Sequence, residues 1–171
     1  METHPSRPVI KIPITRQEIV LEIIGLLGMI GIITYLSMNW ARIPDTVPQH
    51  FGFSGKVDSW GSKGILVVLP VVMGAFYLLL TVLGRFPHQV NYAVEITAEN
   101  AAAQYLNARR LIRWLKFELI YIFSYIEFRT IQIAINAGQS PGGLETAFLP
   151  IALLAVFATL GYFIYRSVRF R

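Results

Sequence analysis

The sequence predicts an all-α integral membrane protein, a four-transmembrane-helix bundle with a shaped external loop and a cytoplasmic amphipathic helix. Of its 171 residues, 54% are hydrophobic and only 15% are charged, whereas a soluble domain is usually about one quarter charged. Four apolar runs are each long enough for a helix to cross a bilayer, which takes about 20 residues. These runs lie near residues 19–39, 64–83, 114–135 and 147–165.

The four runs take up about half of the chain, so residues 1–171 are expected to form a single membrane domain. Helices are the expected form of the runs because a backbone in lipid must satisfy its own hydrogen bonds. The first run is expected to be an uncleaved membrane anchor rather than a signal peptide. Its apolar stretch is long, and the small-x-small pattern of a cleavage site does not follow Ser37.

Lysine and arginine are concentrated before the first run, between the second and third runs, and after the fourth. They are Arg7, Lys11 and Arg16, then Arg85, Arg109, Arg110, Arg113 and Lys116, then Arg166, Arg169 and Arg171. Cytoplasmic segments are enriched in these residues, which predicts a cell (cytoplasmic) membrane protein with both termini and segment 85–113 inside. The same rule and contact with anionic headgroups account for the net charge of +5, so no nucleic-acid partner is expected.

The first two runs carry a few residues that break their apolar pattern. Glu18 and Glu22 are four apart and therefore lie on one helix face, with Glu22 about one turn inside the cytoplasmic interface. In the second run, Pro70 predicts a kink in the outer half.

Residues 44–63 are expected to form a shaped external loop rather than a helix. Pro44 and Pro48 lack the backbone N–H and restrict the residues before them. Phe51 and Trp60 are large and apolar, so we expect them to fold onto the outer ends of the first three spans as a lid. Two interpretations are open: a stiff connector, or a binding loop held on a rigid scaffold.

This loop follows the pattern PxxxPxHFxxxGxxDxWGSK. The residues are Pro44, Pro48, His50, Phe51, Gly55, Asp58, Trp60, Gly61, Ser62 and Lys63. The pattern resembles that of a bacterial membrane domain of unknown function, which also forms the N-terminal part of SdpI-type immunity proteins. Those proteins protect a cell from its own killing peptide, and they usually carry further spans after this domain. The resemblance implies that the loop recognises a peptide or small-molecule ligand.

Segment 85–113 contains the pattern NYxxxITxENxxxQYxxARR, which resembles a subset of the same family. Thr97 and Asn100 are typical of a helix start, and the residues that follow are good helix formers. We expect an amphipathic helix along the cytoplasmic surface that continues into the third span. Its arginines Arg109, Arg110 and Arg113 are expected to face lipid at the interface, and a partner surface is the alternative.

The third span carries a polar stripe along its whole length. Its members are Glu118, Tyr121, Tyr125, Arg129, Gln132 and Asn136, which fall within about 80° of one another on a helix. Glu127 projects from the opposite side. Ionisable residues are costly in a membrane and usually face other protein or a wet cavity, so the stripe indicates either a structural network or a functional path. Arg129 is expected to pair with Asp58 of the loop.

No familiar catalytic motif is present: the chain has no GxSxG, HExxH, Walker loop or GxGxxG. It also has no cysteine. We therefore assign no catalytic residue, expect no cofactor and do not expect an enzyme. His50, Asp45 and Asp58 offer imidazole and carboxylate groups that ligate metals, but their loose placement predicts no metal site. His50 is expected to order the loop through hydrogen bonds.

Three functions are compatible with these features. The first is a membrane protein of ligand-binding, sensing or immunity-like function that acts through its external loop. The second is a small-solute transporter or transporter subunit that uses the polar face of the third span. The third is a structural membrane-assembly protein, with a second copy of itself or another membrane protein as partner.

Overall fold

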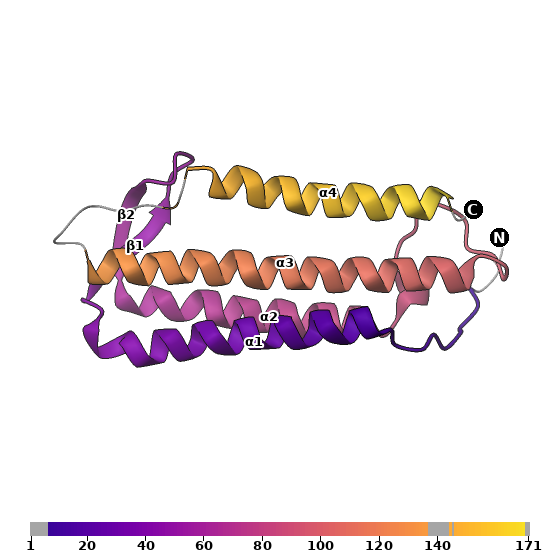
Figure 1. The fold of residues 1–171 in the computed structure, drawn as a ribbon, viewed down its shortest axis with the longest axis horizontal. Helices are drawn as coiled ribbons and strands as arrows, with labels where there is room; N and C mark the ends of the chain where they lie inside the picture. The colour runs from indigo at the N-terminus through magenta and orange to yellow at the C-terminus, as the bar shows by residue number, and fades with distance from the viewer. Residues whose placement is uncertain (1–6, 137–143, 145, 170–171) are drawn as a thin grey trace, which may run out of the picture.

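The computed structural model describes residues 7–136, 144 and 146–169. Within that part, the chain is mostly helical with one two-stranded sheet. In order, the elements are α1 (Arg16–Asn39), η1 (Trp40–Arg42), β1 (Thr46–Phe51), β2 (Val57–Ser62), η2 (Lys63–Val67), α2 (Val68–Leu83), η3 (Pro87–Gln89), α3 (Ala101–Ile135) and α4 (Phe148–Arg169). The four long helices lie along a common axis, with the hairpin at one end and both chain ends at the other (Figure 1).

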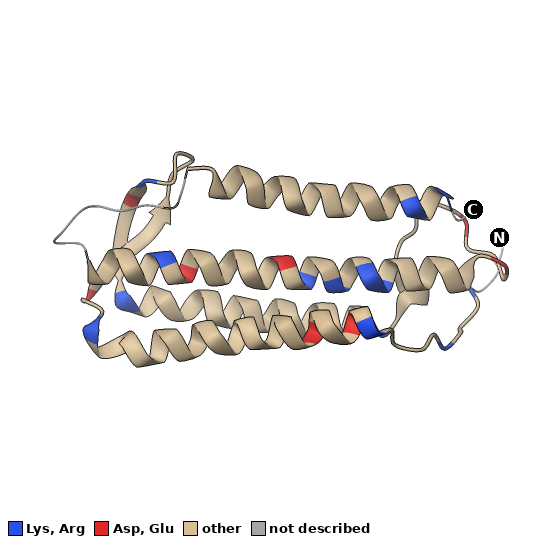
Figure 2. Ribbon diagram, in the orientation of Figure 1, with Lys and Arg blue, Asp and Glu red and all other residues tan. Residues whose placement is uncertain are grey.

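In the described part of the chain, three segments are long and apolar enough to cross a membrane: Arg16–Arg42, Lys63–Leu83 and Phe148–Arg169. Charged residues are absent from most of their length and are concentrated on α3 and near the helix ends (Figure 2). Many large apolar side chains on these helices are exposed, including Leu27, Val71 and Leu154. Apolar surface of this extent is typical of helices that lipid surrounds, so the composition of the helices is that of a membrane protein.

Helix α3 differs from the other three, because charged residues interrupt its apolar sequence. Lys116, Glu118, Glu127 and Arg129 all lie within the predicted third span, and the helix is not among the segments with the composition of a membrane span. The fourth crossing, over residues 114–135, therefore stays a prediction.

Helix α3 is nevertheless the centre of the fold. It packs against α1, α2, α4 and β1, whereas α4 packs chiefly on α3 (Figure 1). Polar side chains join α3 to α4, since Gln104 donates to the carbonyl of Ser167 at 2.7 Å and Asn107 to that of Phe163 at 2.8 Å. The apolar helices thus cover the most polar helix, as expected where lipid surrounds the bundle.

The helix predicted within segment 85–113 continues into residues 114–135 as expected, but it packs into the bundle rather than standing apart from it. Residues 84–100 are irregular apart from η3, and residues 101–113 are the first turns of α3 itself. The predicted start is confirmed: the backbone N–H of Thr97 donates to the Asn100 side chain at 3.0 Å, and that of Asn100 to the Thr97 hydroxyl at 3.4 Å. The helix stays in the bundle because its polar side chains bond to neighbouring elements rather than to solvent.

Pro70 does not kink a helix in its middle. It lies in the first turn of α2, after the 3₁₀ turn η2. A proline is tolerated in this turn because its missing N–H would have no partner within the helix.

The predicted shaped loop is an antiparallel β-hairpin. Its register pairs Val47 with Gly61 and Pro48 with Trp60, and is irregular on both sides of His50. Pro48 is accommodated because the sheet has only two strands and a bulge follows it. Val47 is fully buried in a cluster with Leu36, Ile43, Leu66, Ile131 and Ala134. The hairpin therefore caps the ends of α1 and α3 and the start of α2.

The expected burial of Phe51 and Trp60 is partly wrong. Phe51 is half-buried, and Trp60 is 45% exposed. Val47 and Pro48 on β1 are the side chains of the hairpin that bury most deeply.

Gly55 fixes the turn of the hairpin to the start of the α4 region. Its φ angle is +78°, which glycine adopts readily and other residues avoid. The backbone N–H of Leu144 donates to the Gly55 carbonyl at 2.8 Å. A Cβ added at Gly55 would lie 2.4 Å from the carbonyl oxygen of Leu144, so the position has no room for a side chain.

We predict that Gly55→Ala lowers the free energy of unfolding by more than about 1 kcal/mol, because it combines a positive φ with a backbone clash. The measurement is thermal unfolding of the purified protein in detergent. Gly74→Ala is the matched control, since a Cβ there meets nothing within 4 Å and alanine favours a helix. Equal melting temperatures for the two variants would contradict the prediction.

Candidate functional site

A cavity of about 340 Å³ lies between the hairpin and the helices. Strand β1, η2, the start of α2, the C-terminal third of α3 and the chain around the start of α4 all contribute to its walls. Its lining residues are Pro48, Gln49, His50, Phe51, Ile65, Leu66, Val68, Leu69, Ile126, Glu127, Thr130, Leu144 and Leu149. Most of them are apolar, and Glu127 is the carboxylate among the lining residues that the structure describes.

Glu127 is fully buried. Among the residues that the structure describes, neither of its carboxylate oxygens has a hydrogen-bond partner. Thr130, one turn further along α3, does not supply one, since its hydroxyl donates to the carbonyl of Ile126 at 2.8 Å. An ionised carboxylate in such a place costs several kcal/mol unless a proton or a cation compensates it.

The sequence placed Glu127 on the side of α3 opposite the polar stripe, but did not identify it as a site residue. Its signal was a carboxylate in the middle of a predicted span, with Thr130 three residues further on the same face. What could not be foreseen was that β1 and α2 leave a cavity on that face.

His50 and Asp58 pair within the hairpin, at 2.6 Å between Nδ1 and Oδ1. This confirms that His50 orders the loop through a hydrogen bond. The expected pair of Asp58 with Arg129 is wrong, because Asp58 is engaged by His50 and stays half-exposed. Within the described residues, no group of three or more His, Cys, Asp or Glu side chains is close enough to hold a metal ion.

The other residues of the loop pattern are mostly structural. Lys63 donates from Nζ to the carbonyl oxygens of Ile43, at 2.9 Å, and Trp40, and it lies 4.6 Å from the centre of the Trp40 ring. It therefore ties the end of β2 to the end of α1. Pro44 precedes β1. Pro48, His50 and Phe51 are the pattern residues that line the cavity.

The polar stripe of α3 is divided between two helix interfaces. Toward α1, Tyr121 donates to the carbonyl of Ile24 at 3.1 Å, and Gln132 donates to the Tyr35 hydroxyl. Toward α4, Glu118 accepts from Thr159 at 2.5 Å. Two further residues of the stripe have contacts: the Tyr125 ring stacks on Phe148, and Asn136 bonds to Gln132.

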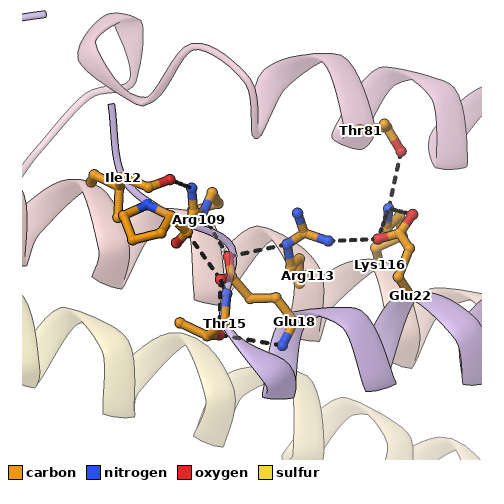
Figure 3. A network of polar contacts seen from close by, with 9 residues as sticks. Ile12, Thr15, Glu18, Glu22, Thr81, Arg109, Arg113 and Lys116 are labelled. Carbon is orange, nitrogen blue, oxygen red and sulfur yellow. Dashed lines mark hydrogen bonds and ion pairs between the residues drawn. The ribbon is translucent and has the colours of Figure 1, made fainter. Parts of the chain in front are cut away.

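A network of ion pairs joins α1 to α3 near the end that carries the termini (Figure 3). Glu18 accepts from Arg109 Nε at 2.5 Å and from Arg113 Nε at 3.2 Å. Glu22 accepts from Arg113 Nη1 at 2.9 Å and from Lys116 Nζ at 2.6 Å. The network is completed by Tyr77, which donates to Glu22, by Thr81, which accepts from Lys116, and by the Thr15 cap of α1.

The expectation that Arg109 and Arg113 face lipid is therefore wrong. Arg109 is only 8% exposed, and Arg113 is half-buried. Residues three and four apart share a helix face, so Arg109, Arg113 and Lys116 form one row on α3. That row meets the row of Glu18 and Glu22 on α1.

We predict that Glu18→Gln lowers the free energy of unfolding by about 3–5 kcal/mol, because it leaves the buried Arg109 without its carboxylate. Thermal unfolding in detergent is the measurement. Glu99→Gln is the control, since that carboxylate is exposed. A loss no larger than that of the control would mean that Arg109 does not depend on Glu18.

Comparison with known proteins gives two matches. A family model described as a domain of unknown function, DUF1648, matches residues 25–74. A protein from Archaeoglobus fulgidus, described as an uncharacterized protein, is 28% identical over 148 residues, which cover 78% of this chain and 79% of the relative. No solved structure matches. The DUF1648 match spans the second half of α1, the hairpin and the first half of α2, so it includes the hairpin side of the cavity that Glu127 lines.

Proposed function

We propose that this chain is a multi-pass membrane protein that binds a small cationic ligand, of the organic amine class, beneath its hairpin. The observation that carries the proposal is Glu127, a fully buried carboxylate in a cavity, with no hydrogen-bond partner among the described residues. A bound ammonium group supplies the charge and the hydrogen bonds that this carboxylate lacks.

The rest of the cavity suits the apolar part of such a ligand. Ile65, Leu69 and Ile126 line it beside Glu127, and its volume of about 340 Å³ is within the range of small-molecule sites. Apolar walls that surround one fixed charge favour a ligand with a hydrocarbon body and one cationic group. The amine of a peptide also belongs to this class, in keeping with the resemblance to immunity proteins.

The proposed orientation follows from the basic residues near the termini. With both termini in the cytoplasm, the hairpin and its cavity open toward the outer surface. Helix α3 is then the fourth span, because it lies parallel to three apolar helices that cover it (Figure 1). A ligand bound here contacts the hairpin, because residues Pro48 to Phe51 form one wall of the cavity. Binding could therefore change the position of the hairpin, which favours a sensing role.

Transport along the polar stripe is the second candidate, and the contacts support it less. Tyr121 and Gln132 bond to α1, while Glu118 bonds to α4. A solute path requires polar groups that face one continuous opening, whereas these side chains are used to join helices.

We predict that the purified protein binds n-butylamine at least about tenfold more tightly than n-butanol, because only the amine pairs with a buried carboxylate. The measurement is titration calorimetry in detergent. Glu127→Gln should remove the preference, whereas Glu118→Gln, on the α4 side, should keep it. Equal binding of amine and alcohol by the unmodified protein would overturn the proposal.

We also predict that Glu127→Gln raises the melting temperature of the ligand-free protein, because a neutral amide has a smaller desolvation cost than a carboxylate. Binding sites commonly reduce stability in this way. Thermal unfolding in detergent without added amine tests this. A lower melting temperature would show that the carboxylate stabilises the fold.

A further inference from the structure

A second cavity, of about 770 Å³, lies at the opposite end of the bundle from the hairpin. Its walls are the N-terminal arm over residues 9–14, the first turns of α1, the end of α2, residues 84–88 and one face of α3. The volume is within the range of sites for small molecules and cofactors. It shares no residue with the cavity of Glu127.

The arm is a fixed wall of this cavity because α3 holds it at two places. The Tyr105 hydroxyl donates to the carbonyl of Pro8 at 3.0 Å. The Arg109 guanidinium donates to the carbonyls of Ile12, at 2.8 Å, and Pro13, at 2.7 Å. Hydrogen bonds of the folded chain therefore hold this wall of the cavity in place.

The segment after α2 is fixed in a similar way. Arg7 donates to the carbonyl of Val90 at 2.6 Å, and the Tyr92 hydroxyl donates to that of Pro87 at 2.8 Å. Burial raises the pKa of the Tyr92 hydroxyl above its usual range, so this donor keeps its proton at neutral pH.

The cavity has an excess of positive charge. Five lysines and arginines line it: Lys11, Arg85, Arg109, Arg113 and Lys116. Two carboxylates, Glu18 and Glu22, pair with the last three of them. Among the described residues, Lys11 and Arg85 have no hydrogen-bonded or ionic partner for their side chains. Three positive charges are thus left over, which favours an anionic ligand.

The other walls of the cavity are apolar, and this apolar surface extends beyond the cavity onto the outside of the bundle. Ile14, Ile19 and Ile23 all line it and are each about half-exposed. Ile19 and Ile23 are four apart on α1, so they form one apolar strip along the outside of the bundle. A ligand that matches both the charges and this strip has an anionic head and a hydrocarbon tail.

We propose that this cavity binds an anionic phospholipid, with its phosphate between Lys11 and Arg85 and an acyl chain along Ile19 and Ile23. The cavity lies where α1 begins and α2 ends, which is the depth of lipid headgroups for helices that cross a membrane. Basic pockets between helices are suited to lipid phosphates.

The test uses the full chain, purified in detergent, with phosphatidylglycerol and phosphatidylcholine as probes. Native mass spectrometry measures how much of each lipid is bound. We expect preferential binding of phosphatidylglycerol, and about tenfold or greater weakening in the Lys11→Gln/Arg85→Gln double variant, because each basic residue contributes about 1 kcal/mol to such binding. Both side chains are exposed and unpaired, so the variant should keep its melting temperature in lipid-free detergent.

The matched control is Arg16→Gln/Lys56→Gln, which removes the same charge from two exposed residues outside the cavity. It should bind phosphatidylglycerol as the unmodified protein does. Equal weakening in both double variants would mean that net charge alone attracts the lipid, and would overturn the proposal. Equal binding of the two lipids would also overturn it. Glycerol phosphate is a third probe. If it binds as well as phosphatidylglycerol, the ligand is a soluble phosphate and the proposal is overturned.

Discussion

The fold depends on the ion pairs between two carboxylates of α1 and three basic residues of α3. A buried charge among apolar helices costs several kcal/mol unless a partner of opposite charge compensates it. Glu18 and Glu22 supply partners to Arg109, Arg113 and Lys116 (Figure 3). The same contacts set the rotation of α3, because its rows of side chains repeat every three or four residues. That rotation in turn directs Glu127 into the cavity beneath the hairpin.

The two ends of the bundle are electrostatic opposites. At the hairpin end, one carboxylate lies in an apolar cavity without a partner among the described residues. At the other end, a larger cavity has more basic residues than carboxylates to balance them. The buried carboxylate favours a cationic ligand, and the excess of basic residues at the other end favours an anionic one. A lipid bound at one end would contact both the N-terminal arm and α1. A cation bound at the other end would contact the hairpin.

The hairpin links the sequence pattern to the proposed site. Lys63, Gly55 and the pair of His50 with Asp58 hold its shape, while Val47 anchors it in the core. Pro48 and Phe51 are then free to form a wall of the cavity. Most residues of the pattern thus stabilise the hairpin that covers the cavity. The carboxylate in the cavity, Glu127, comes from α3, outside the segment that matches DUF1648.

The helices and their apolar character could be predicted from the sequence, because these follow from local periodicity and composition. The sequence predicted the spans over 19–39, 64–83 and 147–165 to within a few residues, the helix start at Asn100, and a hydrogen bond of His50 that orders the loop. The partners of the charged residues could not be predicted in this way. The pairs of Glu18 with Arg109 and of Asp58 with His50, and the isolation of Glu127, depend on how separate elements pack. Arg109 lies 91 residues from its partner Glu18, and no local pattern carries information over that separation.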